Sequence, residues 1–243
     1  MKNNSLHKII NQKKIGLIVY ARMSSKRFPG KVMYKIFKNQ SIIEIILYNL
    51  KKANLLSNTV IATTKNKSDK KIVDFCKIKK IKCFKGDNQN VFLRTTDCIA
   101  KYNFNYFVRI CADRPLFDLK LMKKMIDLIL FKNYDIVTNV NPRTYPKGLT
   151  CEVAKTKIFQ NINNKKLSLN QKEHIFNYFY KKKSYKICNI SNKFSKKFLA
   201  ENFCIDKKTD IKRIKNILSK FSKIKKNITS ENLFKLCKYG NIR

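Results

Sequence analysis

Residues 15–31 read IGLIVY-ARMSSKRFPGK, an apolar run that passes directly into a polar, basic segment. The apolar run, residues 15–20, has the length and β-branched content of a buried strand. In open α/β sheets, ligands bind just beyond the carboxyl ends of such strands. The basic segment, residues 21–31, offers cationic side chains and serine hydroxyls, and Pro29-Gly30 stiffens its turn while allowing a positive φ. The stretch predicts a first strand that leads into a phosphate-binding loop; an ordinary basic surface turn is the alternative.

Apolar, strand-like runs alternate with helical patterns through the first 140 residues. We expect strands at 59–63, 81–84, 106–111 and 135–138, and helices at 41–56, 68–80, 90–102 and 118–131. Ser41 is a plausible N-cap of the first of these helices. The alternation favours an α/β fold with a Rossmann-like, mostly parallel sheet and helices on both faces.

The order changes after residues 141–148. We expect strands near 149–154, 185–190 and 203–205, and helices near 171–182 and 208–221. No linker rich in Ser or Gly divides the chain. The pattern therefore predicts a single domain over residues 14–221, with 141–200 as a subregion, followed by a basic helical tail of no evident function over 222–243.

The composition narrows the class of protein. The 243 residues carry a formal net charge of +40 but are 44% hydrophobic, which is too rich for a disordered chain. Of the 55 basic residues 47 are Lys, and they are spread along the whole chain. This spread favours a compositional bias over a nucleic-acid groove, so we expect no nucleic-acid partner; a non-catalytic nucleic-acid-binding protein is the alternative.

The few arginines are informative because Lys cannot replace a planar guanidinium that grips a phosphate or carboxylate with two hydrogen bonds. Six of the eight arginines lie near predicted strand ends or loops: Arg22, Arg27, Arg94, Arg109, Arg114 and Arg143.

Cysteine use and hydropathy indicate a cytoplasmic protein. The eight cysteines form no C-x-x-C pair and only two histidines occur, which argues against a structural zinc site and for free thiols in a reducing compartment. No run of 18 apolar residues occurs, so we expect no membrane insertion. Residues 1–20 superficially resemble a signal peptide, but they lack a small-residue cleavage site.

Two carboxylates follow predicted strands. Asp113 comes after the run 106–111, and Asp206 comes after 203–205. Two carboxylates at strand ends could share Mg²⁺, which prefers hard oxygen ligands and retains waters and phosphate oxygens. For Asp206, an N-cap of the closing helix is the alternative role.

Residues 21–32 resemble the A-R-x-x-S-x-R-x-P-G-K signature of the cytidylyltransferases of CMP-sugar synthesis. Further similar segments follow in the order of the branch associated with spore-coat polysaccharide synthesis (SpsF-type): 86–94, 113–116, 145–149, 173–175 and 205–206. The resemblance covers roughly residues 14 to 220 and implies a fold of the nucleotide-diphospho-sugar transferase type. It also implies a homodimer, with 141–200 as the sugar-binding and dimerisation subregion.

The resemblance implies a reaction and a set of site residues. A sugar or sugar-acid oxygen would attack the α-phosphorus of CTP, pyrophosphate would leave, and an activated CMP-sugar for surface polysaccharide would result. Positioning and charge neutralisation suit this chemistry. The implied nucleotide-binding residues are Ala21, Arg22, Met23, Ser24, Arg27, Lys31 and Arg94, with Arg22, Lys31 and Asp113 catalytic. Asp113 and Asp206 would hold Mg²⁺, and Arg143, Glu152 and His174 would contact the sugar; for His174 a structural role is the alternative.

The chain departs from the family pattern at four positions. Thr150 stands where Asp is common, Asn90 and Leu93 stand where acidic residues are frequent, and Arg114 stands where a small or acidic residue is usual. These departures bear on the acceptor. A glycosyltransferase of similar fold is the alternative enzyme, but the D-x-D metal motif usual in such enzymes does not occur in the sequence.

Overall fold

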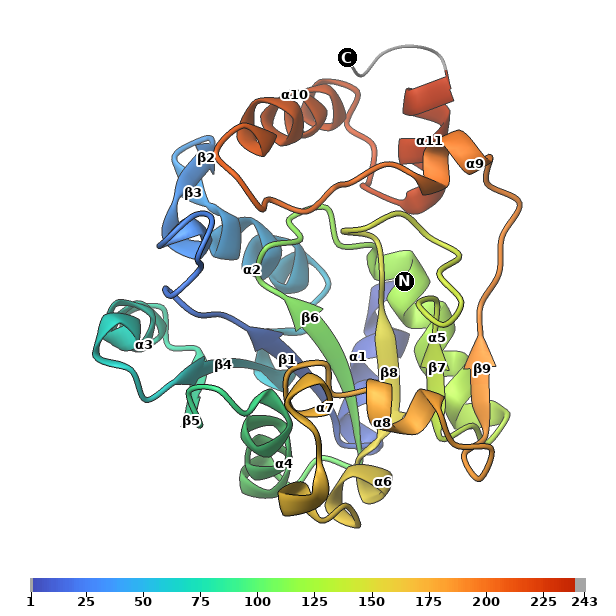
Figure 1. The fold of residues 1–243 in the computed structure, drawn as a ribbon. Helices are drawn as coiled ribbons and strands as arrows, with labels where there is room; N and C mark the ends of the chain where they lie inside the picture. The colour runs from blue at the N-terminus through green and yellow to red at the C-terminus, as the bar shows by residue number, and fades with distance from the viewer. Residues whose placement is uncertain (1, 239–243) are drawn as a thin grey trace.

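A computed structural model of the chain describes residues 2–238, and its centre is a seven-stranded sheet in the order β5-β4-β1-β6-β8-β7-β9 (Figure 1). The strands are β1 (Ile15–Tyr20), β4 (Thr59–Thr64), β5 (Lys82–Gly86), β6 (Tyr106–Cys111), β7 (Ile136–Thr138), β8 (Glu152–Lys155) and β9 (Ile187–Asn189). Only β8 runs antiparallel to its neighbours in this sheet of the described chain. The expected mostly parallel α/β sheet is confirmed.

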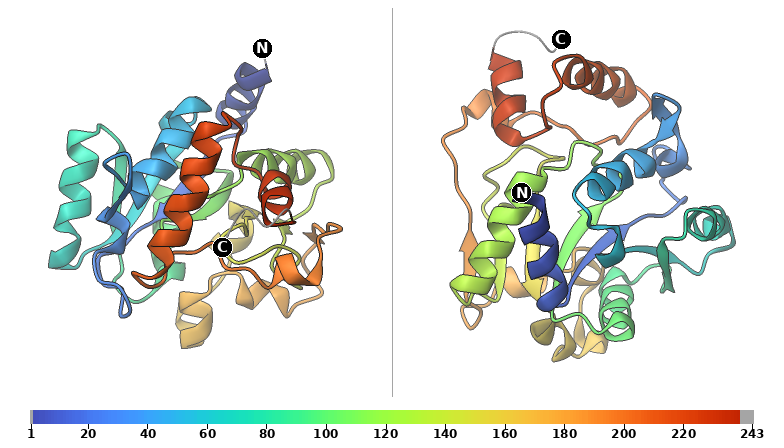
Figure 2. Two further views of the ribbon diagram at one scale, coloured as in Figure 1. Left: turned by 90° about the horizontal axis from the view of Figure 1, so that it is seen from above. Right: turned by 180° about the vertical axis from the view of Figure 1, so that it is seen from behind.

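Helices cover both faces of the sheet, as expected. One face carries α1 (Lys2–Gln12), α2 (Ile42–Lys52), α3 (Lys70–Ile78) and α5 (Leu119–Phe131), seen from behind in Figure 2. The other face carries α4 (Val91–Tyr102), α6 (Thr156–Gln160), α7 (Leu169–Glu173) and α8 (Asn177–Tyr180). Alternate residues of β1 point to opposite faces of the sheet. Leu17 and Val19 join the first core, on the face covered by α1, α2, α3 and α5, and Ile18 joins the second core, on the other face.

Local sequence signals explain where several helices begin. The Ser41 hydroxyl and Glu44 form a capping box at the start of α2, as the predicted N-cap requires. Asn90 caps α4 and Asp118 caps α5 through their side-chain oxygens. A cluster of aromatic rings from β6 and from the region of α4, α6 and α8, in stacked, edge-to-face and tilted contacts, then holds the short helices of the second layer: Phe92, Phe107, Phe159, Phe176 and Phe179.

A third layer lies over the carboxyl ends of the parallel strands, at the top of Figure 1. It contains the hairpin of β2 (Lys35–Phe37) and β3 (Gln40–Ser41), with α9 (Lys196–Leu199), α10 (Asp210–Lys223) and α11 (Ser230–Lys238). Asp118 ties α11 to the start of α5, because its Oδ2 accepts hydrogen bonds from the Ser230 amide (2.7 Å) and hydroxyl (2.8 Å). The helix expected in the tail therefore packs on the domain; residues 239–243 lie outside the described residues.

Two expectations need correction, and one helix was not anticipated. The helix near 171–182 is two short helices, α7 and α8, which His174 separates. Residues 203–205 form no strand: the segment crosses the strand ends, and its amides donate to Lys147 O (2.8 Å) and Asp113 O (3.0 Å). Helix α1 was not anticipated, although Leu6 and Ile10 from it complete the first core.

Candidate active site

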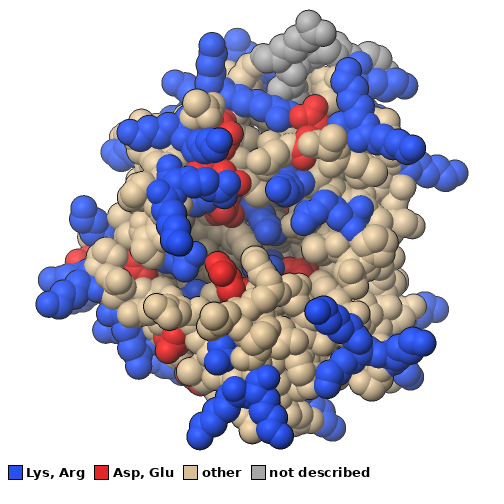
Figure 3. Space-filling model, in the orientation of Figure 1, with Lys and Arg blue, Asp and Glu red and all other residues tan. Residues whose placement is uncertain are grey.

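A cleft of about 1410 Å³ opens at the carboxyl ends of β1 and β6. The chain order reverses between these two strands, since β4 and β5 extend the sheet on one side of β1 and β6 lies on the other. Open α/β sheets bind ligands at such a switch point. Figure 3 shows this face hollowed, with charged side chains around the opening. The acidic lining residues are Asp87, Asp113, Glu173 and Asp206, and the basic ones are Arg22, Lys26, Arg27, Lys31, Arg94, Arg109, Arg114, Arg143, Lys147 and Lys172.

The loop 21–31 follows β1 and forms one wall of the cleft. Gly30 has φ 72°, the positive value expected from the Pro-Gly pair. The Met23 carbonyl closes the loop by accepting hydrogen bonds from the amides of Ser25 (3.0 Å) and Gly30 (2.8 Å). Met23 itself, expected at the nucleotide, is not among the lining residues, because its side chain packs against the core beneath the loop.

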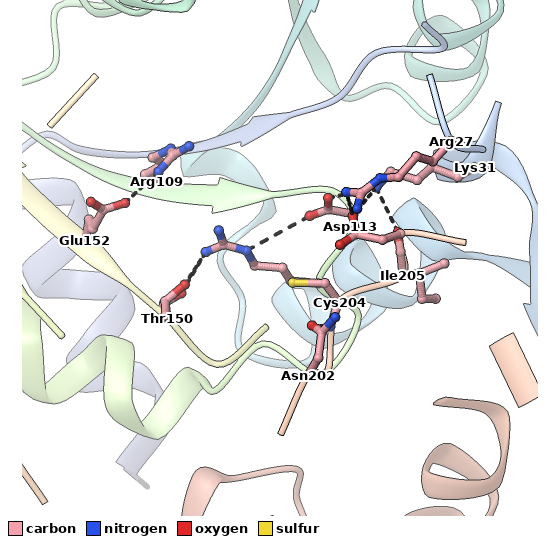
Figure 4. Close-up of polar contacts among 11 residues, drawn as sticks. Arg27, Lys31, Arg109, Asp113, Thr150, Glu152, Asn202, Cys204 and Ile205 are labelled. Carbon is pink, nitrogen blue, oxygen red and sulfur yellow. Dashed lines mark hydrogen bonds and ion pairs between the residues drawn. The ribbon is translucent and has the colours of Figure 1, made fainter. Parts of the chain in front are cut away.

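Lys31 contacts both carboxylates that the sequence proposed as metal ligands, and its contact with Asp113 is labelled in Figure 4. Its Nζ donates to Asp113 Oδ2 (2.9 Å) and to the carbonyl of Ile205 (2.7 Å), and it lies 3.4 Å from Asp206 Oδ1. Arg27 Nη2 lies 2.8 Å from the same Asp206 oxygen. Segments far apart in the chain thus bring two acids and two bases together at the ends of β1 and β6.

Asp206 is not the N-cap of α10. The N-cap residue is Thr209, and the amide of Asp206 donates to the Asp210 carboxylate (2.7 Å). The Asp206 side chain is therefore left for Arg27 and Lys31.

The residues fit a magnesium site that substrate and water would complete. No group of three or more His, Cys, Asp or Glu side chains within residues 2–238 could enclose a metal by itself. Mg²⁺ commonly takes only one or two carboxylates and fills its remaining positions with phosphate oxygens and waters. The convergence of Asp113 and Asp206 suits that mode, with the Lys31 ammonium lying between them.

Arg94 braces the neighbouring loop. Its side chain is buried, and Nη1 donates to the carbonyl of Asp87 (2.6 Å). Burial lowers the pKa of this guanidinium below its ordinary value. Asn90, one of the departures from the family pattern, caps α4 and accepts from the Leu93 amide (2.9 Å).

Glu152 holds Arg109 and does not itself line the cleft. Both of its carboxylate oxygens are engaged: Oε2 accepts from Arg109 Nη1 (2.7 Å) and Oε1 accepts from the Tyr180 hydroxyl (2.7 Å). Burial alone would lower the pKa of Arg109, but Cys111 and Glu152 raise it above its ordinary value. For Tyr180, burial raises the pKa of the phenol, so the hydroxyl stays protonated and can donate its hydrogen bond. Glu152 was expected near the sugar. It does not line the cleft, and it acts there only by holding Arg109, which does line it.

Two departures from the family pattern touch each other. Arg114 Nη1 donates to the hydroxyl (2.5 Å) and the carbonyl (3.2 Å) of Thr150, and Arg114 Nε lies 4.0 Å from Asp113 Oδ1. Within the described chain the buried Nε has no hydrogen-bond partner. The side chain thus reaches from the end of β6 to the segment before β8.

The structure explains the glycine at position 148 of the motif 145–149. Gly148 has φ 90°, and an added Cβ would lie 2.5 Å from the backbone carbon of Phe203. Because Gly148 has no side chain, the segment that carries Asp206 can pass close to it at the carboxyl end of β6.

The structure brings together most of the residues predicted for the site. Arg22 contacts Glu173 at the rim (3.8 Å), and His174 lines the cleft where α7 ends. Sequence reasoning missed Lys147, which no strand-end signal marked. The predicted residues that line the cleft are Ala21, Arg22, Ser24, Arg27, Lys31, Arg94, Asp113, Arg143, His174 and Asp206.

Solved structures share the whole fold. A cytidylyltransferase from Leptospira borgpetersenii superposes with a TM-score of 0.84 at 26% identity, covering 93% of this chain and 94% of that one. A CMP:2-keto-3-deoxy-manno-octonic acid synthetase in complex with CTP gives a TM-score of 0.62 at 12% identity, covering 85% and 99%. The fold is therefore that of the nucleotide-diphospho-sugar transferases.

The chain belongs to the cytidylyltransferase family, whose model matches residues 17–234. An uncharacterised protein of Methanocaldococcus jannaschii is 34% identical over 67% of this chain, and the Bacillus subtilis spore coat polysaccharide biosynthesis protein SpsF is 25% identical over 60%. The chain spans 65% and 61% of the length of these two relatives. The resemblance to the cytidylyltransferases that the sequence suggested is confirmed.

Proposed function

We propose that this protein transfers the cytidylyl group of CTP to a sugar or sugar-acid acceptor and releases pyrophosphate. The observation that carries the proposal is the contact of Lys31 with Asp113 and Asp206 beside the basic loop, at the switch point of the sheet. The name of the Bacillus subtilis relative refers to spore-coat polysaccharide, which supports a product destined for surface polysaccharide.

The basic loop is suited to a triphosphate. Arg22, Arg27 and Lys31 supply cations, and Ser24 supplies a hydroxyl, along one wall of the cleft. Cations held in place before the reaction stabilise the charge that develops on the transferred phosphoryl group and on the leaving pyrophosphate. Burial leaves only 11% of the Lys31 side chain exposed, which strengthens its interactions with charge in the cleft.

Asp113 and Asp206 are the residues that would hold Mg²⁺. The ion would neutralise phosphate oxygens and orient the triphosphate for in-line displacement. Lys31 and Arg27 are already paired with these carboxylates, so they orient the two acids toward the loop that we assign to the triphosphate.

A second group of basic residues along the cleft favours an acidic acceptor. Arg109, Arg114, Arg143 and Lys147 make up this group, and within residues 2–238 neither Arg143 nor Lys147 forms an ion pair with a side chain. Unpaired cations in a cleft attract anionic groups such as the carboxylate of a sugar acid.

Pyrophosphate release tests the proposal directly. Purified protein is incubated with Mg²⁺, each nucleoside triphosphate, and a panel of sugar acids, neutral sugars and phosphorylated sugars. We expect release with CTP and an acidic acceptor, and none for Asp113→Ala. If no combination releases pyrophosphate and no triphosphate raises the melting temperature of the protein, the proposal is overturned. The homodimer and the cytoplasmic location remain predictions.

A further inference from the structure

A buried carboxylate lies beneath the basic loop and outside the cleft. Asp69 follows β4 at the end of a 3-10 turn (Lys67–Asp69), and its side chain is fully buried. Within the described chain it forms no ion pair, yet it accepts four hydrogen bonds. Oδ2 accepts from the hydroxyl of Thr63 (2.9 Å) and from the amide (3.0 Å) and hydroxyl (2.5 Å) of Thr64. Oδ1 accepts from the amide of Met23 (2.7 Å).

Met23 is the residue through which this carboxylate reaches the loop. Its amide is held by Asp69, and its carbonyl accepts from Ser25 and Gly30. The peptide groups on both sides of Met23 therefore anchor the loop to the end of β4 and close the loop on itself. The side chains of Arg22 and Ser24, which line the cleft, flank this anchor.

The geometry requires both carboxylate oxygens. Each side of Asp69 faces donors, with the Met23 amide on one side and the Thr64 amide on the other. An asparagine has one acceptor oxygen and one donor nitrogen, so either orientation would set an N–H against an N–H. A full negative charge under a phosphate-binding loop repels the ligand, so the contribution of this carboxylate to phosphate binding lies in the shape of the loop.

We propose that Asp69 is a positioning residue that fixes loop 21–31 in its ligand-binding conformation before the triphosphate arrives. The assignment of the ligand rests on the function proposed above. When only a fraction of molecules is competent to bind, the apparent dissociation constant rises by the inverse of that fraction. Loss of the anchor therefore raises the KM for CTP, and saturating CTP restores the loop and kcat.

Asp69→Asn is the central variant. Thr64→Val is a milder one that keeps the strand-forming shape and removes one of the four donors to Asp69, together with the acceptor of the Asn66 amide. Asp118→Asn is the matched control, because Asp118 is also a buried aspartate that accepts backbone amides, from Leu121 and Ser230, away from the cleft. All three variants are expected to melt at lower temperature than the wild type.

Amide hydrogen exchange of the ligand-free protein measures how readily the loop opens, and this measurement does not depend on CTP. We expect peptides covering 21–31 to exchange roughly tenfold faster in Asp69→Asn, less so in Thr64→Val, and at the wild-type rate in Asp118→Asn. Unchanged exchange in Asp69→Asn would overturn the positioning role, whether or not CTP is the substrate.

Steady-state kinetics supply the second measurement. We expect Asp69→Asn to raise the KM for CTP by roughly tenfold with kcat within about twofold, while Asp118→Asn keeps both. A KM for CTP at or below the wild-type value would show that the negative charge outweighs the geometry, and it would overturn the proposal. If no variant and no wild type binds CTP while the exchange result holds, the proposed function fails and the loop anchor stands.

Discussion

Arg114 donates a hydrogen bond from Nη1 to the hydroxyl of Thr150, across 36 residues of sequence. Both residues depart from the pattern of the family, so the two departures form one contact in the part of the cleft that we assign to the acceptor. Thr150 offers the Arg114 guanidinium no charge, and the nearest carboxylate, that of Asp113, lies 4.0 Å from its Nε. The pair is therefore expected to favour an anionic acceptor.

Thr150→Asp tests this assignment. The new carboxylate would pair with Arg114 and neutralise its charge, so we expect the KM for an acidic acceptor to rise roughly tenfold, because a hydrogen bond to a charged group is lost. The KM for CTP should not change. Thr150→Ser keeps the hydroxyl and serves as the control. The same KM for the acceptor in Thr150→Asp and the wild type would remove this pair from acceptor recognition.

Lys31→Met separates the roles of the ammonium and the carboxylates. Asp113 and Asp206 lose their shared cation, so we expect turnover to fall at least roughly 100-fold, as when a preorganised donor to the transition state is removed. Without the ammonium between them, the carboxylates should also bind Mg²⁺ more tightly.

The rise in melting temperature with added Mg²⁺ and no nucleotide measures the second effect of Lys31→Met. We expect a larger rise in Lys31→Met than in the wild type, and none in the double variant that also carries Asp113→Asn. An equal rise in Lys31→Met and the wild type would show that Lys31 does not compete with the metal.

Glu152→Gln should destabilise the fold. The substitution leaves the buried Arg109 guanidinium without its carboxylate, and breaking such a pair costs about 3 to 5 kcal/mol. Urea unfolding at neutral pH measures the loss. Tyr180→Phe removes the hydrogen bonds of the hydroxyl with this carboxylate and with Thr138, and it should cost only about 2 kcal/mol. Equal losses in the two variants would contradict a dominant role for the Arg109–Glu152 pair.

The capping box of α2 predicts a pH dependence. Burial alone would raise the pKa of Glu44, but hydrogen bonds from Ser41 and the charge of Lys79 lower it below its ordinary value of 4.5. A pKa lowered by folding adds stability above the unfolded value, and that stability is lost as the pH falls through the folded value.

Glu44→Gln checks this sign, because glutamine keeps the capping hydrogen bond and loses the charge. At pH 7 the wild type should be more stable by roughly 0.5 kcal/mol, the usual contribution of an acidic residue in the first turn of a helix. We expect the difference to shrink as the pH falls from about 4.5, where this glutamate becomes protonated in the unfolded chain, through the lower pKa of the folded protein. A difference that stays constant down to pH 3 would argue against the charged cap.

Local sequence determined the elements and their order. Apolar runs of strand length predicted β1, β4, β6 and β7, and the Pro29-Gly30 pair predicted the positive φ at Gly30. Strand periodicity, N-caps and glycine conformations depend on only a few neighbouring residues, so they can be predicted from a single sequence. The alternation of elements also predicted the parallel sheet, and the resemblance of residues 21–32 and the later segments to the cytidylyltransferases implied most of the residues that line the cleft.

The tertiary structure alone decided which side chains meet. Lys31 contacts Asp206 across 175 residues, Met23 reaches Asp69 across 46, and Glu152 turns from the expected sugar pocket to Arg109. The reversed direction of β8 and the irregular course of 203–205 likewise depend on distant partners. No periodicity or spacing encodes such contacts, because each arises when separate strand ends converge at one edge of the sheet and must satisfy one another's buried charges and hydrogen bonds.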